Sequence, residues 1–224
     1  MARITPTQTK SLTIGGRREP KYLFPTVSTS GSFSWQDGDS NSYNASTDTY
    51  VYDKVGSVGL NFSTTGTVIT DYNSATDNRY GLLRFGGIES TFATPSTVTV
   101  TAASLDLNVD TEGQGFDIFN LLKTGINFST VTATSLGTMV AGTDYTSIAM
   151  GSWPGQDTFT GAINVVLDNA TVQGWIRNSS SNLGMWQMAT DIPNGDGQQV
   201  SSVETVTQSH RPKLNVTYTG SGLA

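Results

Sequence analysis

Short stretches in which apolar and polar residues alternate constrain the fold of this chain more than any other feature of its sequence. Ser104–Val109 places two leucines and a valine on one face, with an aspartate and an asparagine opposite. Thr97–Ala102 and Lys213–Thr219 repeat the pattern. A period of two is typical of a strand that covers a core on one side only. The 34 Thr and 24 Gly, with only 13% charged residues, also disfavour a helical protein.

Further segments extend this pattern along the chain, separated by turns rich in Gly, Asn and Asp. Helix is predicted at Asp168–Arg177, where Asp168 or Asn169 can cap a turn ahead of an apolar face, and at Phe116–Lys123. We therefore predict an all-β fold, an antiparallel jelly-roll β-sandwich with one or two short helices. The additional predicted strands are Thr49–Tyr52, Val68–Asp71, Leu82–Phe85, Val131–Leu136, Ile163–Leu167 and Met185–Ala189.

Charge divides the chain into two unequal parts. Residues 1–21 carry a net charge of +4, whereas residues 22–224 carry −10. We predict an extended basic N-terminal arm and linker over residues 1–44, a β-sandwich body over 45–220 and a short tail over 221–224. The arm is too poor in apolar residues to build a core of its own, so we expect a neighbouring subunit to hold it. The predicted anchoring residues of the arm are Arg3, Lys10, Arg17, Arg18 and Lys21.

Several classes of protein are disfavoured by what the sequence lacks. Without Cys there is no disulfide framework, thiolate zinc site or cysteine nucleophile, and a single His210 excludes multi-histidine metal sites. No apolar run is long enough to span a membrane, and no secretory signal follows Met1. We expect no metal, no cofactor, no membrane partner and no export. An acidic body and an arm without aromatic residues before Tyr22 also disfavour nucleic acid.

Five segments, in the same order over residues 48–219, carry a resemblance to a known family. They are Asp48–Val51, Gly81–Phe85, Ala103–Leu107, Val165–Trp175 followed by Asn182–Gly184, and Ser201–Glu204 followed by Arg211–Tyr218. Together they resemble DNRLRE-type domains, which are jelly rolls related to carbohydrate-binding modules. The resemblance implies a jelly roll used as a non-catalytic module on a secreted or surface protein. Residues 1–44 match nothing in the family, and residues 124–160 offer only Trp153 where its members carry Trp-rich signatures.

Catalytic and metal-binding chemistry finds little support in the residue pattern. A Ser-His-Asp site would have to use His210, but the sequence contains no G-x-S-x-G nucleophile motif. The neighbouring Arg211 also disfavours the imidazolium that such a mechanism needs. None of the four glutamates is marked as sharing a cleft with another, so paired-carboxylate hydrolysis is a remote alternative. The segment Asp37–Asn41 resembles the start of an EF-hand loop but lacks its glycine and its final glutamate, which indicates a turn. We predict that the chain is not an enzyme.

Aromatic residues are the remaining candidates for binding. Trp35, Tyr43, Tyr145 and Trp153 lie in polar, Gly- and Ser-rich settings. We expect them to be exposed, as platforms for a glycan or as contacts between subunits. The two other tryptophans, Trp175 and Trp186, are predicted to lie in the core.

Two functions from different classes follow from these features. The first is a structural protein of a virion, a bacteriophage capsid decoration or cement protein or a related head or tail appendage. Its partners would be the major capsid protein or other virion subunits, with homo-oligomerisation as a trimer and assembly in the host cytoplasm. The alternative is a carbohydrate-binding module or surface adhesin whose partner is a glycan. A glycoside hydrolase or lyase is a remote third.

Overall fold

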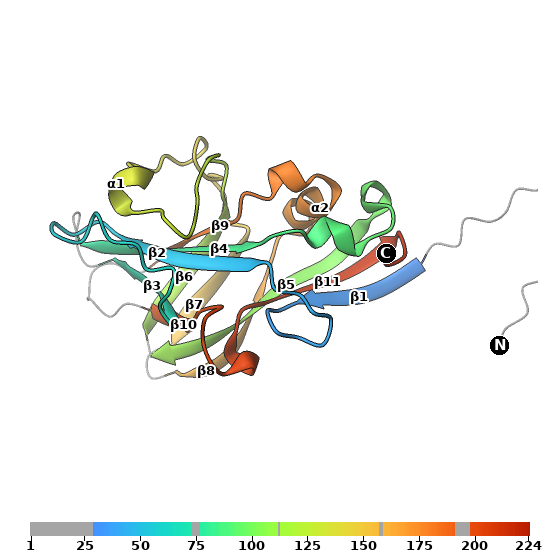
Figure 1. The fold of residues 1–224 in the computed structure, drawn as a ribbon, viewed down its shortest axis with the longest axis horizontal. Helices are drawn as coiled ribbons and strands as arrows, with labels where there is room; N and C mark the ends of the chain where they lie inside the picture. The colour runs from blue at the N-terminus through green and yellow to red at the C-terminus, as the bar shows by residue number, and fades with distance from the viewer. Residues whose placement is uncertain (1–28, 73–76, 112, 157–158, 191–197) are drawn as a thin grey trace, which may run out of the picture.

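The computed structural model describes residues 29–72, 77–111, 113–156, 159–190 and 198–224 (Figure 1). Antiparallel strands dominate this part of the chain. In chain order they are β1 (Thr29–Trp35), β2 (Ser46–Tyr52), β3 (Thr67–Tyr72), β4 (Asn78–Phe85), β5 (Thr99–Thr111), β6 (Gly113–Asn120), β7 (Gly151–Gln156), β8 (Gly161–Val166), β9 (Met185–Ala189), β10 (Gln198–Ser201) and β11 (Lys213–Gly220).

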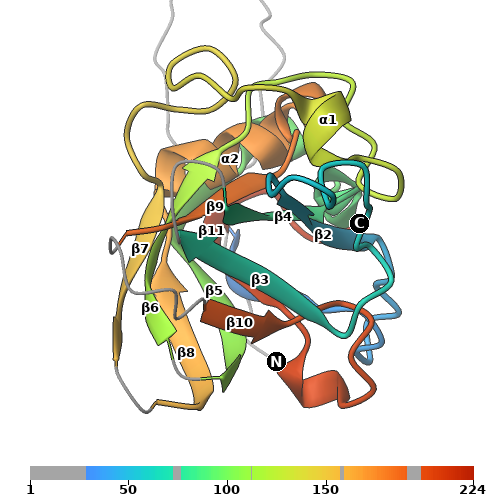
Figure 2. The same ribbon diagram turned by 90° about the vertical axis from the view of Figure 1, so that its left-hand side faces the viewer.

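The strands form one sheet that curls over on itself. Its order is β1-β11-β5-β10-β3-β4-β9-β6-β7, with β2 beside β4 and β8 beside β5. β3 pairs with β10 on one side and with β4 on the other, and so joins the two halves. Figures 1 and 2 show the half containing β2, β4 and β9 lying across from the half containing β5, β8 and β10. The predicted all-β antiparallel sandwich is confirmed.

A large hydrophobic cluster, the main core, fills the space between the two halves. Its most deeply buried side chains include Trp35, Phe85, Leu105 and Phe116, all exposed by 1% or less. β5 explains why the sequence folds this way: its buried residues alternate from Ala103 to Val109, and after an irregularity at Thr101 and Ala102 the strand also buries Val100. It joins two segments that the sequence indicated as separate strands, and β11, β8 and β10 pair with successive parts of it.

The helices agree with the sequence in one place and differ in two. The helix α2 (Asn169–Arg177) is confirmed, with Asp168 as its N-cap and its apolar face buried in the main core. The predicted helix over Phe116–Lys123 is wrong, because Phe116 and Ile118 are buried at a strand period in β6. The predicted strand over Val131–Leu136 is also wrong. Thr132 and Ser135 form a capping box there and begin the short helix α1 (Ala133–Leu136).

The body begins earlier than the sequence indicated. Residues 29–35, expected within a linker, form β1 and pair with β11 at all seven positions. The polar composition of this segment hid a strand whose Trp35 packs inward. At the other end, Leu223 bridges Phe92, and the Ala224 amide donates to the Thr91 carbonyl at 2.9 Å, so the tail lies against the body.

A second, smaller hydrophobic cluster lies outside the main core. Residues 121–148, which include α1, cover the face of β2, β4 and β9 that points away from the main core, and we call this segment the outer layer. Figure 2 shows α1 on this side of the sheet, opposite to β8 and β10. Val51, Leu82 and Trp186 of the sheet pack there against residues of the outer layer such as Leu136. We call this set the outer cluster.

Candidate functional site

The predicted anchoring residues Arg3, Lys10, Arg17, Arg18 and Lys21 lie outside the described residues. The point where that segment meets the body is described. β1 is at one end of the strand order and pairs with β11 alone among the described strands. The N-terminal segment therefore enters the sandwich through an edge strand.

Trp35 is not the exposed platform that the sequence indicated. Its side chain is 1% exposed, and its indole Nε1 donates to the Thr91 hydroxyl at 2.9 Å. Phe33 and Phe92 pack on it, with ring centroids 5.1 Å and 6.2 Å away. The prediction of exposure is wrong because Trp35 pairs with Leu214 of β11 and turns into the main core.

The other three predicted aromatic residues are half-buried and lie in different parts of the body. Tyr43 donates its hydroxyl to the Gly86 carbonyl at 2.9 Å, and burial raises the pKa of this phenol well above its ordinary value. Trp153 in β7 contacts Phe116 and Phe159, with ring centroids 5.7 Å and 6.1 Å away. Tyr145 belongs to the outer layer. The structure therefore does not bring the four predicted residues together as one platform.

Tyr145 instead joins aromatic residues that sequence reasoning had not assigned to a site. The ring centroid of Tyr145 lies 6.2 Å from that of Trp186. Trp186 in turn stacks on Tyr80, with ring centroids 4.8 Å apart and an angle of 19° between the ring planes. These three residues line a cavity of about 550 Å³ between the outer layer and the sheet. Leu136, Met139 and Met188 add apolar surface. We call this cavity the aromatic pocket.

The position of Trp186 has a signal in the sequence. The prediction that Trp186 is buried is confirmed, since its side chain is 2% exposed. Alternation within β9 places Trp186 and Met188 on one face, opposite to Met185, which lies in the main core. A strand with apolar residues on both faces indicates a sheet covered on both sides. Predicting the aromatic pocket would also have required knowing that the outer layer covers this second face of the sheet.

A second, shallower hollow lies on the outer surface of β1, β11, β5 and β8. Its volume is about 800 Å³, and Ser, Thr and Asn side chains dominate its lining. Two of its lining residues, Asn164 and Asn215, donate to the two carboxylate oxygens of Asp106 at 2.6 Å and 2.8 Å. We call this surface the polar face. These two side-chain amides are already paired with Asp106, which leaves them few hydrogen bonds to offer a ligand.

A pair of carboxyl groups lies where the β10–β11 connection meets β2. Asp48 is 2% exposed and accepts the Val203 amide at 2.7 Å. Burial raises the pKa of Asp48 well above its ordinary value, and the neighbouring carboxylate of Glu204 raises it further. Neither residue lines the aromatic pocket or the polar face. The pair thus joins a buried carboxyl group on β2 to an exposed one in the β10–β11 connection.

The remaining candidates lie apart from these features. His210 is exposed at the end of a short 3₁₀ turn. In the Asp37–Asn41 segment, the side chains of Asp39 and Asn41 accept amides of the same turn at 2.7 Å and 3.0 Å, as a turn predicts. Within the described ranges no three His, Cys, Asp or Glu side chains group in a way that suits a metal ion.

Two comparisons with known proteins identify no relative of this chain. A scan against models of protein families finds no match, and a search of curated proteins finds none either. In the part of the chain that the structure describes, no helix has the length and hydrophobicity needed to cross a membrane.

Proposed function

We propose that this chain is a non-enzymatic structural protein of a virion, a capsid decoration or cement protein of a bacteriophage. In this proposal its basic N-terminal residues attach it to neighbouring subunits, and its β-sandwich is presented outward. The observation that carries the proposal is the division of charge, +4 over residues 1–21 and −10 over the rest. A short basic segment ahead of an acidic body is suited to binding an acidic protein surface.

The edge strand β1 supports an attachment at this end of the body. Its seven residues, TSGSFSW, contain neither a charge nor a proline, and its outer edge pairs with no described strand. Monomeric proteins usually protect such edges with charges, prolines or bulges. An edge without charges or prolines favours addition of a strand from another chain, although the Ser34 carbonyl already accepts the Asn41 side chain at 2.7 Å. Because β1 directly follows the basic segment, a partner that binds residues 1–28 would lie beside this edge.

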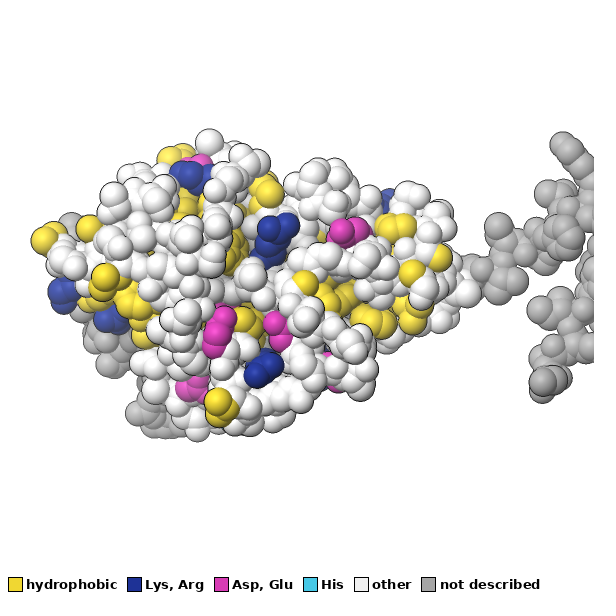
Figure 3. Space-filling model, in the orientation of Figure 1, with side chains coloured by type: hydrophobic (Ala, Val, Ile, Leu, Met, Phe, Trp, Pro, Cys, Tyr) yellow, Lys and Arg dark blue, Asp and Glu magenta, His cyan; other side chains and the backbone are white. Residues whose placement is uncertain are grey.

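The surface of the body supports a role as the displayed part. In Figure 3 the Lys, Arg, Asp and Glu side chains on the visible face are of mixed sign and lie among many uncharged groups. No broad charged patch there competes with the N-terminal segment for an acidic partner. Attachment and display are thus assigned to different parts of the chain.

The test compares the full chain with a variant that lacks residues 2–25, using particles of the source virion that lack this protein. Cosedimentation should recover the full chain, and the deletion should reduce binding at least tenfold while leaving the melting temperature unchanged. A matched control replaces Arg3, Lys10, Arg17, Arg18 and Lys21 by Gln. This control should bind weakly and lose the salt dependence of the full chain. Equal binding by the deletion variant would contradict attachment through the N-terminal segment.

A further inference from the structure

The aromatic pocket has the dimensions and the chemistry of a ligand site. Its volume of about 550 Å³ falls in the range of roughly 300–1,000 Å³ that is usual for small-molecule sites. We propose that it binds a short neutral saccharide. This site lies apart from residues 1–28 and from β1, so the inference goes beyond attachment to a particle and does not depend on it.

The sheet side of the pocket is a rigid wall. Tyr80 on β4 and Trp186 on β9 are on neighbouring strands, which pair through Leu82 and Trp186. Val51 of β2 pairs with Tyr80 and completes the wall from the other neighbouring strand. Side chains that are held in register by three strands lose little freedom when a ligand binds.

The opposite wall is fixed by hydrogen bonds that tie the outer layer to the β2–β3 connection. Thr134 of α1 donates both its amide and its hydroxyl to the Val58 carbonyl, at 2.8 Å and 3.0 Å. Asn61 donates its side-chain amide to the carbonyls of Phe128 and Val131 at 3.1 Å and 2.7 Å. These bonds hold the cavity open in the protein alone, as expected of a pre-formed site.

Trp186 supplies an unused hydrogen-bond donor. Its indole Nε1 is buried and finds no acceptor among the described residues. A buried donor without a partner is costly, and most tryptophans that are buried to this degree avoid the cost. Trp35 and Trp175 do so here, because their Nε1 atoms donate to Thr91 and Asn120 at 2.9 Å each. Trp35 borders a smaller hollow, but its donor is already paired. Trp186 lines the aromatic pocket with its donor unpaired, and a hydroxyl oxygen of a ligand would complete its bonding.

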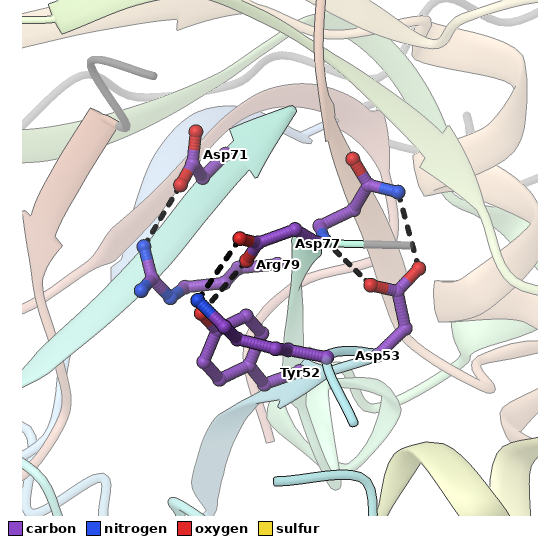
Figure 4. A network of polar contacts seen from close by, with 7 residues as sticks. Tyr52, Asp53, Asp71, Asp77 and Arg79 are labelled. Atoms are coloured by element: carbon purple, nitrogen blue, oxygen red, sulfur yellow. Dashed lines mark hydrogen bonds and ion pairs between the residues drawn. The ribbon is translucent and has the colours of Figure 1, made fainter. Parts of the chain in front are cut away.

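Asp53 supplies an acceptor at the rim of the same pocket. Its carboxylate already accepts the backbone and side-chain amides of Asn78, which fixes its position. Figure 4 shows this contact beside a second set, in which Tyr52 and Lys54 donate to Asp77 at 2.7 Å and 3.1 Å. A carboxylate has about four acceptor sites, so Asp53 retains capacity for a sugar hydroxyl.

The charge of the lining selects among saccharides. Asp53 is the charged residue of the lining, and no Lys or Arg of the described chain contributes to it. An acidic sugar would meet a carboxylate without a compensating cation, which disfavours it. A neutral pyranose instead offers apolar C–H faces to Tyr145 and Met139 and hydroxyls to Asp53 and Trp186. This assigns the carbohydrate-binding alternative to a site that includes Tyr145 but excludes Trp35 and Trp153.

The experiment titrates the full chain with a panel of neutral hexoses, N-acetylhexosamines and their short oligomers, with uronic and sialic acids as comparators. Binding is followed by calorimetry and by tryptophan fluorescence. Trp186→Phe keeps an aromatic ring but removes the donor, so it should weaken binding about five- to tenfold, as expected for one lost hydrogen bond. Tyr145→Ala should weaken binding about tenfold or more. Trp153→Phe is the matched control and should bind like the wild type.

Each outcome bears on the proposal. A fluorescence change that persists in the Trp153→Phe variant and disappears in the Trp186→Phe variant supports it. No binding across the neutral panel, preference for acidic sugars, or affinity unaffected by both pocket variants would overturn it. Binding of an apolar peptide in place of any saccharide would also overturn it. Melting temperatures identify any variant that fails to fold, and Tyr145→Phe then serves as the milder replacement at the half-buried position.

Discussion

The main core and the outer cluster are built from the same kinds of side chain, but the main core is closely packed and the outer cluster encloses a cavity. In the main core, aromatic and aliphatic residues from both halves of the sandwich and from α2 enclose one another, and the Nε1 donors of Trp35 and Trp175 are satisfied. In the outer cluster, a layer of loops and one helical turn covers the sheet incompletely and leaves a cavity of about 550 Å³. The tryptophan there keeps an unpaired donor.

This difference separates stability from binding within one fold. A closed core gains dispersion and hydrophobic energy at every contact. A cavity gives up part of that energy, and an unpaired buried donor adds a further cost. Such costs are typical of sites that are completed by a ligand. Substitutions matched between the two clusters test whether this difference in packing is real.

Leu105→Ala should give the largest effect. Leu105 lies at the centre of β5 and is 1% exposed, so its removal leaves a cavity that the surrounding strands cannot fill. We expect a loss of about 4 kcal/mol in the free energy of unfolding. Denaturant unfolding measures this loss. A loss below about 2 kcal/mol would mean that the main core tolerates cavities as the outer cluster does.

Leu136→Ala is the matched change in the outer cluster. Leu136 is 3% exposed but borders the aromatic pocket, so loop movement and solvent can relieve part of the cavity. We expect a loss of about 2 kcal/mol, at the lower end of the range for this substitution. The same variant should show altered binding in the saccharide titration. A loss equal to that of Leu105→Ala would contradict the distinction between the two clusters.

The helix caps provide a smaller matched pair. Asp168 accepts the amide and the hydroxyl of Thr171 at 2.8 Å and 2.6 Å, and these bonds hold the pKa of its carboxyl below the ordinary value. Asp168→Ala should cost about 1 kcal/mol, because α2 packs on the main core. Thr132→Ala removes the cap of α1 in the outer layer and should cost about 0.5 kcal/mol. Thermal unfolding of both variants measures the two losses of stability. A larger loss for Thr132→Ala than for Asp168→Ala would contradict the distinction between the two clusters.

Asp48 tests the sandwich through pH. Because its pKa is raised in the folded chain, its contribution to stability is greatest below the unfolded pKa and declines as pH rises towards the folded pKa. Asp48→Asn keeps an oxygen to accept the Val203 amide but does not titrate. Between about pH 7 and about pH 4, the stability of the wild type relative to this variant should rise as pH falls. Unfolding curves measured across this range would show a constant difference between the two proteins if the burial of Asp48 had no effect.

The strands show how far local pattern predicts this fold. Lys213–Thr219 alternates clearly and Met185–Ala189 is rich in apolar residues, and the structure places β11 and β9 there. β1 was not predicted as a strand, because small polar residues surround Phe33 and Trp35, its two aromatic residues. The position of the outer layer was not predicted, because it depends on hydrogen bonds between segments that are distant in the sequence. One example is the bond from the Leu121 amide to the Gly184 carbonyl at 2.9 Å. No periodic pattern within residues 121–148 records such a contact.

The candidate site was predictable only in its parts. Tyr145 was identified from its polar setting, and Trp186 was correctly expected to be buried. Their proximity, with ring centroids 6.2 Å apart, arises from a fold of the outer layer onto β9 that neither neighbourhood in the sequence indicates. Trp35 shows the reverse case, in which a polar neighbourhood suggested exposure and strand pairing buried the ring.

Hydrogen exchange with and without a bound neutral saccharide tests the central claim most directly, namely that the outer cluster forms the binding site and the main core supports it. Peptides covering residues 133–145 and 185–188 should gain protection when the saccharide binds. Peptides from β1 and β11, which form part of the polar face, should remain unchanged. Protection that appears on β1, β11 and β8 instead, with none in the outer layer, would contradict the account.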